Sequence, residues 1–467
     1  MHIIDTYNLE SLTEVITYDT TDKHCMYGEC EKCSKKEYEL TSHYRATDRV
    51  SYIQWATVDK DHKDNPGVSS KITLKKKFEC SQEELVEKFA ILLQNFRRHL
   101  FNLRQQYAFL RALKLNLPVN DCVVHVDFSE NYGCKYSAEV QAVHFGASHQ
   151  QATLHTGVYY VGGGSAPTTF CTISESRGKG PPAIWQHLEP ILVEIRENWP
   201  DVSTIHFFSD GPCTKYKQRG NFYLFCTEIY KKGFTRGTWN YFEASHGKGA
   251  PDGVGGALKR RADKLVSQGF DIPTALSLYQ ALSEGKSKVK LFYIPEQAVE
   301  DAVKQMPSDI PTVPTTMRIH QVVTLSPGKI RYRDVSCMCS SNGNLECDCQ
   351  KTKSFTFNAT DDPTEDPNHI TPEVVQWHSP EVVGKWCALV YDHIIYPGII
   401  QEVNETHCQV KCMHKVGSNR FFWPSKEDLH WYPLQDVLTL IPPPENVTSR
   451  HMAIAREVWD TLASHEK

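Results

Sequence analysis

Two apolar segments that each end in an aspartate place the strongest constraint on how this chain folds. They run from Val123 to Asp127 and from Ile205 to Asp210, and both break off immediately afterwards. A short, nearly continuous apolar run is typical of a strand that is buried on both faces of a sheet. The sequence therefore predicts a buried sheet with carboxylates at its strand ends, where oxygen-ligand metal sites are commonly assembled.

The segments around these two strands follow a regular order. We expect strands at 122–128, 138–145 and 150–161, a β-rich segment at 167–173, helices at 181–198, 219–231, 253–269 and 272–283, and strands at 203–209 and 236–244. Three strands followed by alternating helices and strands is the order of the ribonuclease-H-like fold. The expected class is thus α/β, with a mixed sheet flanked by helices.

In that topology Asp127 and Asp210 would end neighbouring strands. Like charges a few ångströms apart raise each other's pKa unless a divalent cation offsets them. A third acid would complete a two-metal site for Mg²⁺ or Mn²⁺, of the kind that cuts or joins phosphodiesters. Asp252, at the start of a basic helix, is favoured, and Glu243, at a strand end, is the alternative. The competing interpretation is that these aspartates merely cap turns.

A glycine-rich stretch, from Asn240 to Arg261, lies beside these candidate acids. Glycines among polar residues suit a backbone that closely approaches a ligand. His246 and Lys248 would sit at the mouth of the site, where they could relay a proton or meet a phosphate. A basic run on the following helix suits a nucleic-acid backbone: Lys259, Arg260 and Arg261.

Several short strings in this region resemble one family of proteins. They are Val-Asp-Phe-Ser-Glu-Asn-Tyr at 126–132, Val-His-Phe-Gly at 143–146, Gln-Ala-Thr-Leu-His-Thr-Gly-Val at 151–158, Ser-Asp-Gly-Pro-Cys-Thr-Lys-Tyr-Lys at 209–217 and His-Gly-Lys-Gly at 246–249. They look like transposon-derived proteins common in fish and invertebrate genomes, which resemble DDE-type cut-and-paste transposases with a ribonuclease-H-like core. The resemblance covers roughly residues 50–440. It implies Asp127 and Asp210 as the first two acids and Asp252 or Glu243 as the third.

Two cysteine clusters are candidate metal sites, and zinc is predicted for the one at 337–349. Cys337, Cys339, Cys347 and Cys349 supply four thiolates, enough for one tetrahedral ion, although free thiols on a hairpin with an Asn-Gly turn are the rival interpretation. An N-terminal cluster of Cys25, Cys30 and Cys33 needs a fourth ligand, for which His24 and His43 are candidates. Sixteen cysteines in a chain of this length, with no secretion signal expected, favour reduced thiols.

The C-terminal part predicts a small all-β barrel of the SH3 or Tudor type, because short strand patterns alternate with turns. Its aromatic residues are either core residues or a cage for methylated lysine: Trp386, Tyr391, Tyr396 and Trp423. We expect the following divisions: an N-terminal Cys-containing segment 1–50, a strand and long helix 51–120, the catalytic core 121–300, a β-rich segment with the Cys cluster 301–355, a linker 356–380, the barrel 381–441 and a C-terminal helix 442–467.

The function expected from these features is metal-dependent DNA cleavage or strand transfer in the nucleus, by an active, decayed or domesticated transposase-like protein. The alternative is a non-catalytic protein that binds nucleic acid or chromatin, with histone tails held by the barrel. A net charge of -5 means that any nucleic-acid binding depends on local patches. No run of 18 apolar residues exists, so no membrane span is expected. The oligomeric state is left open.

Overall fold

The structure is a computed structural model. It describes residues 8–33, 36–61, 69–138, 150–164, 166–212, 214–243, 247, 249–285, 287–357, 382–391, 394–404, 407–417, 419–424, 428–447 and 451–462. The chain divides into two compact units, Met1–Asn358 and Ala359–Lys467. Each unit is described by itself below.

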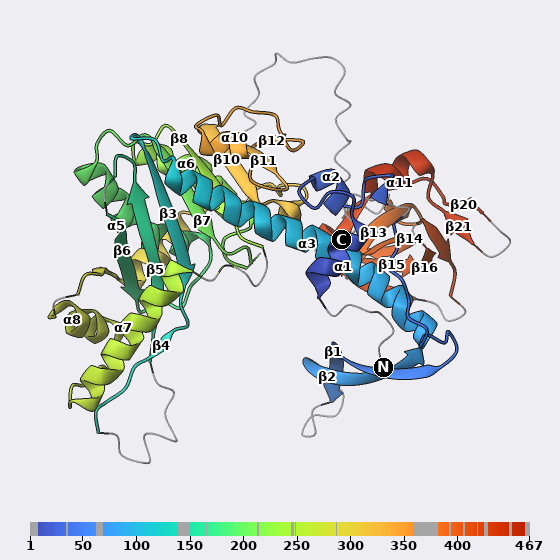
Figure 1. The fold of residues 1–467 in the computed structure, drawn as a ribbon, viewed down its shortest axis with the longest axis horizontal. Helices are drawn as coiled ribbons and strands as arrows, with labels where there is room; N and C mark the ends of the chain where they lie inside the picture. Colours follow the sequence, from blue (N-terminus) through green and yellow to red (C-terminus); the bar gives the residue numbers. More distant parts are fainter. Residues whose placement is uncertain are drawn as a thin grey trace. The chain divides into compact units, whose positions relative to one another are not determined.

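Unit 1 begins with short helices, a two-stranded ribbon and one long helix (Figure 1). The short helices are α1 (Leu9–Ile16) and α2 (Lys23–Met26), and the ribbon pairs β1 (Arg49–Asp61) with β2 (Ser69–Ser81). Helix α3 (Gln82–Leu115) follows directly. Its start is fixed by a capping box, in which the Glu84 amide donates to Ser81 Oγ at 3.1 Å and the Ser81 amide donates to Glu84 Oε2 at 2.8 Å.

A large mixed sheet forms the centre of unit 1. Its strand order is β12-β11-β10-β8-β7-β3-β5-β6-β9, and β4 pairs with β5 off this path. The strands are β3 (Asp121–Phe128), β4 (Tyr132–Gly133), β5 (Gln151–Val161), β6 (Thr168–Ser174), β7 (Thr204–Ser209), β8 (Arg236–Tyr241), β9 (Lys290–Ile294), β10 (Gln321–Ser326), β11 (Lys329–Arg333) and β12 (Lys353–Thr356). Strand β3 is parallel to β7, β7 is parallel to β8, and β5 is antiparallel to both β3 and β6.

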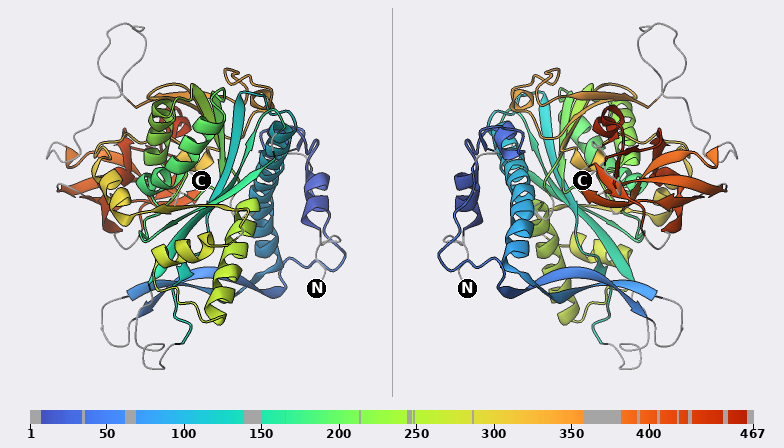
Figure 2. Two further views of the ribbon diagram at one scale, coloured as in Figure 1. Left: turned by 90° about the vertical axis from the view of Figure 1, so that its left-hand side faces the viewer. Right: turned by 90° about the vertical axis from the view of Figure 1, so that its right-hand side faces the viewer.

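Helices cover both faces of this sheet. They are α5 (Pro181–Asn198), α6 (Arg219–Lys231), α7 (Ala250–Ser267), α8 (Ala275–Ser283) and α9 (Glu296–Lys304), with single turns η2 (Thr316–Arg318) and α10 (Met338–Ser341). On β3, alternate residues such as Val124 pack with α5 and α6, whereas Val123 packs with Phe109 of α3. Helices α7 and α8 pack on the second face of β5 and β6. Both views of Figure 2 show the ribbon at the N-terminal end of α3.

Unit 2 consists of short antiparallel strands in two sheets, ordered β18-β15-β14-β13-β19 and β16-β17-β21-β20. The elements are β13 (Trp386–Tyr391), β14 (Ile394–Val403), β15 (His407–Cys412), β16 (His414–Gly417), β17 (Arg420–Phe422), β18 (Leu429–Pro433), η4 (Leu434–Asp436), β19 (Val437–Leu440), β20 (Glu445–Asn446), β21 (Met452–Ala453) and α11 (Arg456–Leu462).

The expected mixed α/β unit followed by antiparallel strands is confirmed at this level. The strand expected at 138–145 lies, from residue 139, outside the described residues, and so does the linker from residue 358. The C-terminal helix expected over 442–467 is wrong in its first part. There β20 pairs with β21, and the Ile454 amide donates to Asn419 Oδ1 at 3.0 Å, so the backbone hydrogen bonds go to other strands and loops. Within the described residues, no helix is both long and apolar enough to cross a bilayer.

Candidate active site and metal-binding clusters

Asp127 and Asp210 come from neighbouring parallel strands. The register of β3 and β7 runs from Asp121↔Thr204 to His125↔Phe208, and each aspartate follows two positions after the last pair. Neighbouring strands lie about 4.8 Å apart, and side chains two positions apart share a face. The two carboxylates are therefore side by side at one sheet edge, on the face that α3 covers.

Each of these two carboxylates has one oxygen that lacks a hydrogen-bond partner among the described residues. Asp127 Oδ1 and Asp210 Oδ1 are both buried, and neither makes a hydrogen bond within the part of the chain that the structure describes. Burial raises the pKa of Asp127 to about 7, and the charges of Asp210 and Asp252 act in the same direction, against Lys215. Burial also raises the pKa of Asp210. Buried, unpartnered carboxylate oxygens are the donors that Mg²⁺ and Mn²⁺ prefer, so the pair fits a divalent cation.

The two candidates for a third acid occupy different surroundings. Asp252 lies in the first turn of α7, and its charge raises the pKa of both Asp127 and Asp210. Its Oδ2 accepts a hydrogen bond from the Gly249 amide at 2.8 Å, so it also caps its own helix. Glu243 lies two residues after β8 and contacts two histidines instead, with Oε2 at 3.2 Å from His320 Nε2 and Oε1 at 3.5 Å from His99 Nδ1.

The glycine-rich stretch passes directly against the site. A Cβ on Gly247 would lie 2.7 Å from Asp210 Cβ, and a Cβ on Gly249 would lie 2.8 Å from His125 Cε1. These glycines therefore allow the backbone to approach the aspartate and the histidine, as their sequence pattern indicated. His246 and Lys248 lie outside the described residues.

Of the three basic residues on α7, one reaches the loop that follows Asp127. Lys259 Nζ donates to the Glu130 carbonyl at 3.4 Å, and its charge acts on Lys179 beside Asp127. Arg261 turns toward the loop after α8, where a Cβ on Gly285 would meet its guanidinium. Arg260 is exposed and lies along its own helix. Successive helical residues point about 100° apart, so the run spreads around α7 and does not form one patch.

Three lysines lie near the acids, although the sequence had not predicted a role for them. Lys215 lowers the pKa of Asp127 and Asp210, and Lys217 lowers that of Asp210. Lys217 is 4% exposed, with Nζ 3.3 Å from the Met317 carbonyl and 5.4 Å from the centre of the Tyr241 ring. Lys179 Nζ lies 5.6 Å from the centre of the Phe128 ring. The Lys-Tyr-Lys sequence, five residues after Asp210, is the signal from which two of them could have been found.

The four cysteines at 337–349 have the geometry of a metal cluster. Their sulfurs all lie within 4.8 Å of one another, with Cys337 and Cys347 at 3.5 Å and Cys339 and Cys349 at 3.8 Å. Four sulfurs at about 2.3 Å from one tetrahedral zinc would be about 3.8 Å apart. The cluster could therefore hold a metal such as zinc. The cysteine pairs are joined by α10 and a turn at Gly343, with φ of 80°, and not by a β-hairpin.

Buried polar groups surround this cluster. Arg333 Nη1 donates to Cys347 Sγ at 3.1 Å. Burial acts to raise the pKa of Cys347, but its hydrogen bonds with Arg333 and Cys337 and the charge of Arg333 outweigh burial and bring the pKa to about 7. Just before the cluster, the Ser336 amide donates to Gln106 Oε1 of α3 at 2.8 Å, and Gln106 Nε2 donates to the carbonyls of Tyr241 and His320.

The N-terminal cluster holds three thiols. Cys25, Cys30 and Cys33 have sulfurs within 4.8 Å of one another and could also hold a metal such as zinc. Among the described residues neither His24 nor His43 joins this group, and His24 Nδ1 lies 3.1 Å from Glu29 Oε2. All cysteines that the structure describes are free thiols.

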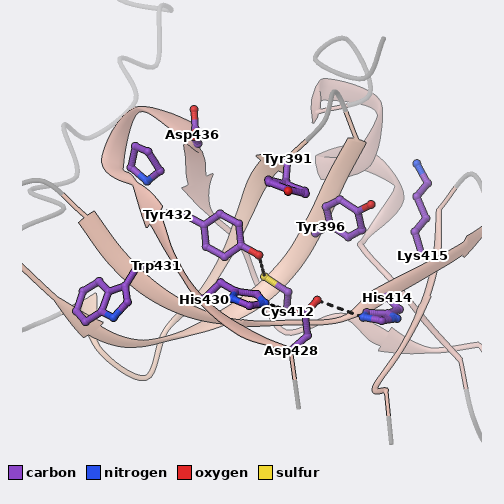
Figure 3. Close-up of a pocket in the computed structure, with 11 residues that line it drawn as sticks. Tyr391, Tyr396, Cys412, His414, Lys415, Asp428, His430, Trp431, Tyr432 and Asp436 are labelled. Atoms are coloured by element: carbon purple, nitrogen blue, oxygen red, sulfur yellow. Dashed lines mark hydrogen bonds and ion pairs between the residues drawn. The ribbon is translucent and has the colours of Figure 1, made fainter. Parts of the chain in front are cut away.

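Unit 2 contains a pocket of about 550 Å³ (Figure 3). Its lining combines aromatic rings, two carboxylates and two histidines: Tyr391, Tyr396, Cys412, His414, Lys415, Asp428, His430, Trp431, Tyr432, Pro433 and Asp436. Of the four aromatic residues singled out in the sequence, Tyr391 and Tyr396 line this pocket, whereas Trp386 and Trp423 pair with each other, with ring centroids 5.6 Å apart, and do not line it. Tyr391 and Tyr432 form two walls at 77° with centroids 6.0 Å apart.

Comparison with known proteins gives one match. Residues 106–336 match a family described as a domain of unknown function, DUF8701, and this segment contains the aspartates and the lysines around them. It ends immediately before Cys337, the first residue of the four-cysteine cluster. No curated protein and no solved structure matches the chain.

Proposed function

We propose that this protein is a metal-dependent phosphodiester transferase that acts on DNA in the nucleus, in the manner of a DDE transposase. The observation that carries the proposal is the pair formed by Asp127 and Asp210. The two side chains lie on adjacent parallel strand ends, each with a buried oxygen that has no partner among the described residues. Perturbed acids that share one site are a mark of catalysis more often than of structure.

The strand order supports a ribonuclease-H-like core. Strands β6-β5-β3-β7-β8 place the first strand of the core, β3, at the centre, with antiparallel neighbours on one side and parallel neighbours on the other. Strand β9 extends this core at one edge and β10 to β12 extend it at the other, while β4 pairs with β5 off this path. The fold alone does not determine the chemistry, so the proposal depends on the site.

Asp127, Asp210 and Asp252 would hold the cation, because Asp252 acts electrostatically on both aspartates whereas Glu243 is in contact with two histidines. A bound Mg²⁺ or Mn²⁺ would supply Lewis-acid stabilisation of charge on a phosphodiester. Asp252 accepts the hydrogen bond from the Gly249 amide through Oδ2, so it would bind the ion through its other carboxylate oxygen.

The lysines would hold the substrate. Lys179, Lys215 and Lys259 act electrostatically on each other or on the aspartates, so positive charge borders the acidic centre. A phosphodiester needs such a border, because the backbone of DNA is a line of negative charge that carboxylates alone would repel. Lys217 would orient Asp210 from its buried position.

A second candidate function is non-catalytic binding of chromatin, and the unit 2 pocket favours it. Rings of Tyr391, Tyr396 and Tyr432 face a cavity that Asp428 and Asp436 also line. Lys415 lines it too, but its Nζ lies 5.1 Å from the centre of the Trp459 ring. Aromatic faces together with carboxylates suit a methylated ammonium group, as on a histone tail. In this interpretation unit 2 is an SH3- or Tudor-like barrel and unit 1 is a scaffold.

Cleavage by matched variants distinguishes these functions. Wild-type protein should nick or join duplex DNA only with Mg²⁺ or Mn²⁺, and Asp210→Asn should lower that rate at least about a hundredfold. Asp201→Asn, an exposed turn residue, makes the same change of charge and should leave the rate unchanged. Both variants should bind DNA. Wild-type protein that binds DNA but never cleaves it would favour the scaffold interpretation.

A further inference from the structure

The β1–β2 ribbon is a sheet of its own. Its pairing runs without interruption from Arg49↔Ser81 to Asp61↔Ser69, and it is hydrogen-bonded to no other strand that the structure describes. Thirteen residues per strand give a length of roughly 43 Å at about 3.3 Å per residue. Helix α3 contacts the ribbon where Lys88 Nζ donates to Tyr52 Oη at 2.7 Å. A two-stranded ribbon is at best marginally stable in water by itself, so the exposed part beyond this contact is expected to have a partner.

One face of the ribbon is exposed, and it combines apolar and basic side chains. Trp55 is 62% exposed and pairs with Lys75, whose Nζ lies 5.3 Å from the centre of the Trp55 ring. Ile53 is 69% exposed and pairs with Lys77. Directly opposite residues in an antiparallel pair point to the same side, so these four residues form one surface, here called the ribbon face.

The ribbon is also a local concentration of positive charge. In the strand segments whose side chains the structure describes, 49–58 and 72–81, the cations are Arg49, Lys75, Lys76 and Lys77, and the single anion is Glu79. Glu79 pairs with Lys77 at 3.4 Å, but both side chains are more than 60% exposed, so the pair neutralises little. The chain as a whole is negative, which makes this patch a deviation from its surface.

We propose that the ribbon face binds the duplex DNA that flanks the cleaved phosphodiester. The major groove of B-DNA admits a two-stranded β-ribbon. Lysines would contact the phosphates, and Ile53 and Trp55 would lie against apolar base edges such as the thymine methyl group. This inference rests on the proposed function, since the same duplex would supply the strand that is cut at Asp127 and Asp210.

Helix α3 connects the ribbon to the strands that carry Asp127 and Asp210, so its length sets the distance between the ribbon face and the acids. Its first residue, Gln82, follows the ribbon directly, and Phe109 packs on Val123 and Phe208 at the strands that carry the aspartates. From Gln82 to Phe109 the helix rises roughly 40 Å at about 1.5 Å per residue. This corresponds to about 12 base pairs at about 3.4 Å per step. Ribbon contacts should therefore lie about one helical turn from the cut.

The test uses the full chain and a random-sequence duplex long enough to reach both surfaces. Replacing Lys75 and Lys77 of the ribbon face by Gln should weaken binding at least about tenfold near 0.1 M salt and make the salt dependence less steep by about 2 in log–log slope. The matched control replaces the exposed Lys288 and Lys304 by Gln, with the same loss of charge, and should change neither. Trp55→Ala should weaken binding several-fold while the salt slope stays constant.

Each outcome decides something. If the ribbon variant binds like the control variant while wild-type protein binds and cleaves, the ribbon proposal is overturned and the proposed function stands. If ribbon variants lose binding as expected but wild-type protein never cleaves, the ribbon proposal stands and the catalytic one falls. If Trp55→Ala dissociates a dimer in sedimentation while DNA binding is unchanged, the ribbon face joins two copies of this chain. Wild-type protein that binds no duplex overturns both proposals.

Discussion

Replacing Asp127 by Asn should stabilise the metal-free protein at alkaline pH. The wild-type carboxylate is buried beside Asp210, and both effects favour its neutral form. The pKa of Asp127 in the folded protein is about 7, above the value of 3.8 for a free aspartate. Its contribution to stability is thus fully present below about pH 4 and is lost as pH rises through 7. An amide has a similar shape and acquires no charge as the pH rises.

The expected size of this stabilisation follows from the pKa shift of Asp127. Each pKa unit corresponds to about 1.36 kcal/mol. Between pH 5 and pH 8, the full shift would therefore increase the free energy of unfolding of Asp127→Asn relative to wild type by about 2.7 kcal/mol. Because Asp127 keeps some solvent contact, we expect about 1–2 kcal/mol. Unit 1 has an entropy of unfolding of roughly 0.75 kcal/mol/K by its length, so the excess of the melting temperature of Asp127→Asn over that of wild type should be about 1–3 °C larger at pH 8 than at pH 5.

Calorimetry at pH 5 and pH 8, with and without Mn²⁺, checks this reasoning. Mn²⁺ should raise the melting temperature of wild-type protein at pH 8, less at pH 5 because protons compete, and should not stabilise the variant. Asp121 is the control on the same strand, because its Oδ2 is hydrogen-bonded to His206 at 3.1 Å. Asp121→Asn should not raise the melting temperature of the protein at either pH. An Asp127→Asn variant that is less stable than wild type at pH 8 would show that Asp127 is a structural residue.

Two further predictions concern the metal sites. Cys347→Ser should lower the zinc content by one ion per chain, measured by elemental analysis. The control Cys171→Ala changes a buried cysteine outside both clusters and should keep the zinc content of wild type. Unchanged zinc in Cys347→Ser would contradict the four-cysteine site. Gly247→Ala should weaken Mn²⁺ binding in titration calorimetry, because its Cβ would lie 2.7 Å from Asp210 Cβ. Gly253→Ala, which meets nothing within 4 Å, should bind normally, and equal affinities would place Asp210 outside the cation site.

Local signals predicted much of the fold of unit 1. Ser81 and Glu84 fixed the start of α3 because a capping box depends only on neighbouring residues. The edges of the sheet were harder, since β10 joins β8 through residues 81 positions apart, such as Gln321 and Asn240, and no local pattern encodes that pairing. Strands β20 and β21 also escaped prediction, because Met452 of β21 pairs with Phe421 of the distant strand β17 and this pairing overrides a helical pattern.

The candidate site was predictable where chemistry follows strand ends, as for Asp127 and Asp210. It was not predictable where one side chain serves two purposes. Asp252 is both a helix cap and a charge beside the acids, and the sequence cannot rank these roles. Lys217 was missed because buried lysines are rare, so a lysine close to a turn is expected to be in solvent.

The hydrogen bonds of Gln106 to distant parts of the chain limit how early helix α3 can dock while the chain is being synthesised. Its amide bonds the carbonyls of Tyr241 and His320 and the hydroxyl of Ser336, which lie 135, 214 and 230 residues further along. At about 5–20 residues per second, a ribosome needs roughly 10–50 s to make the last of these partners. Throughout that time the buried position of Gln106 would leave a polar group unsatisfied, so α3 cannot complete its docking early. The nascent chain should therefore present the apolar side of α3 to chaperones until the strand that precedes the four-cysteine cluster has emerged.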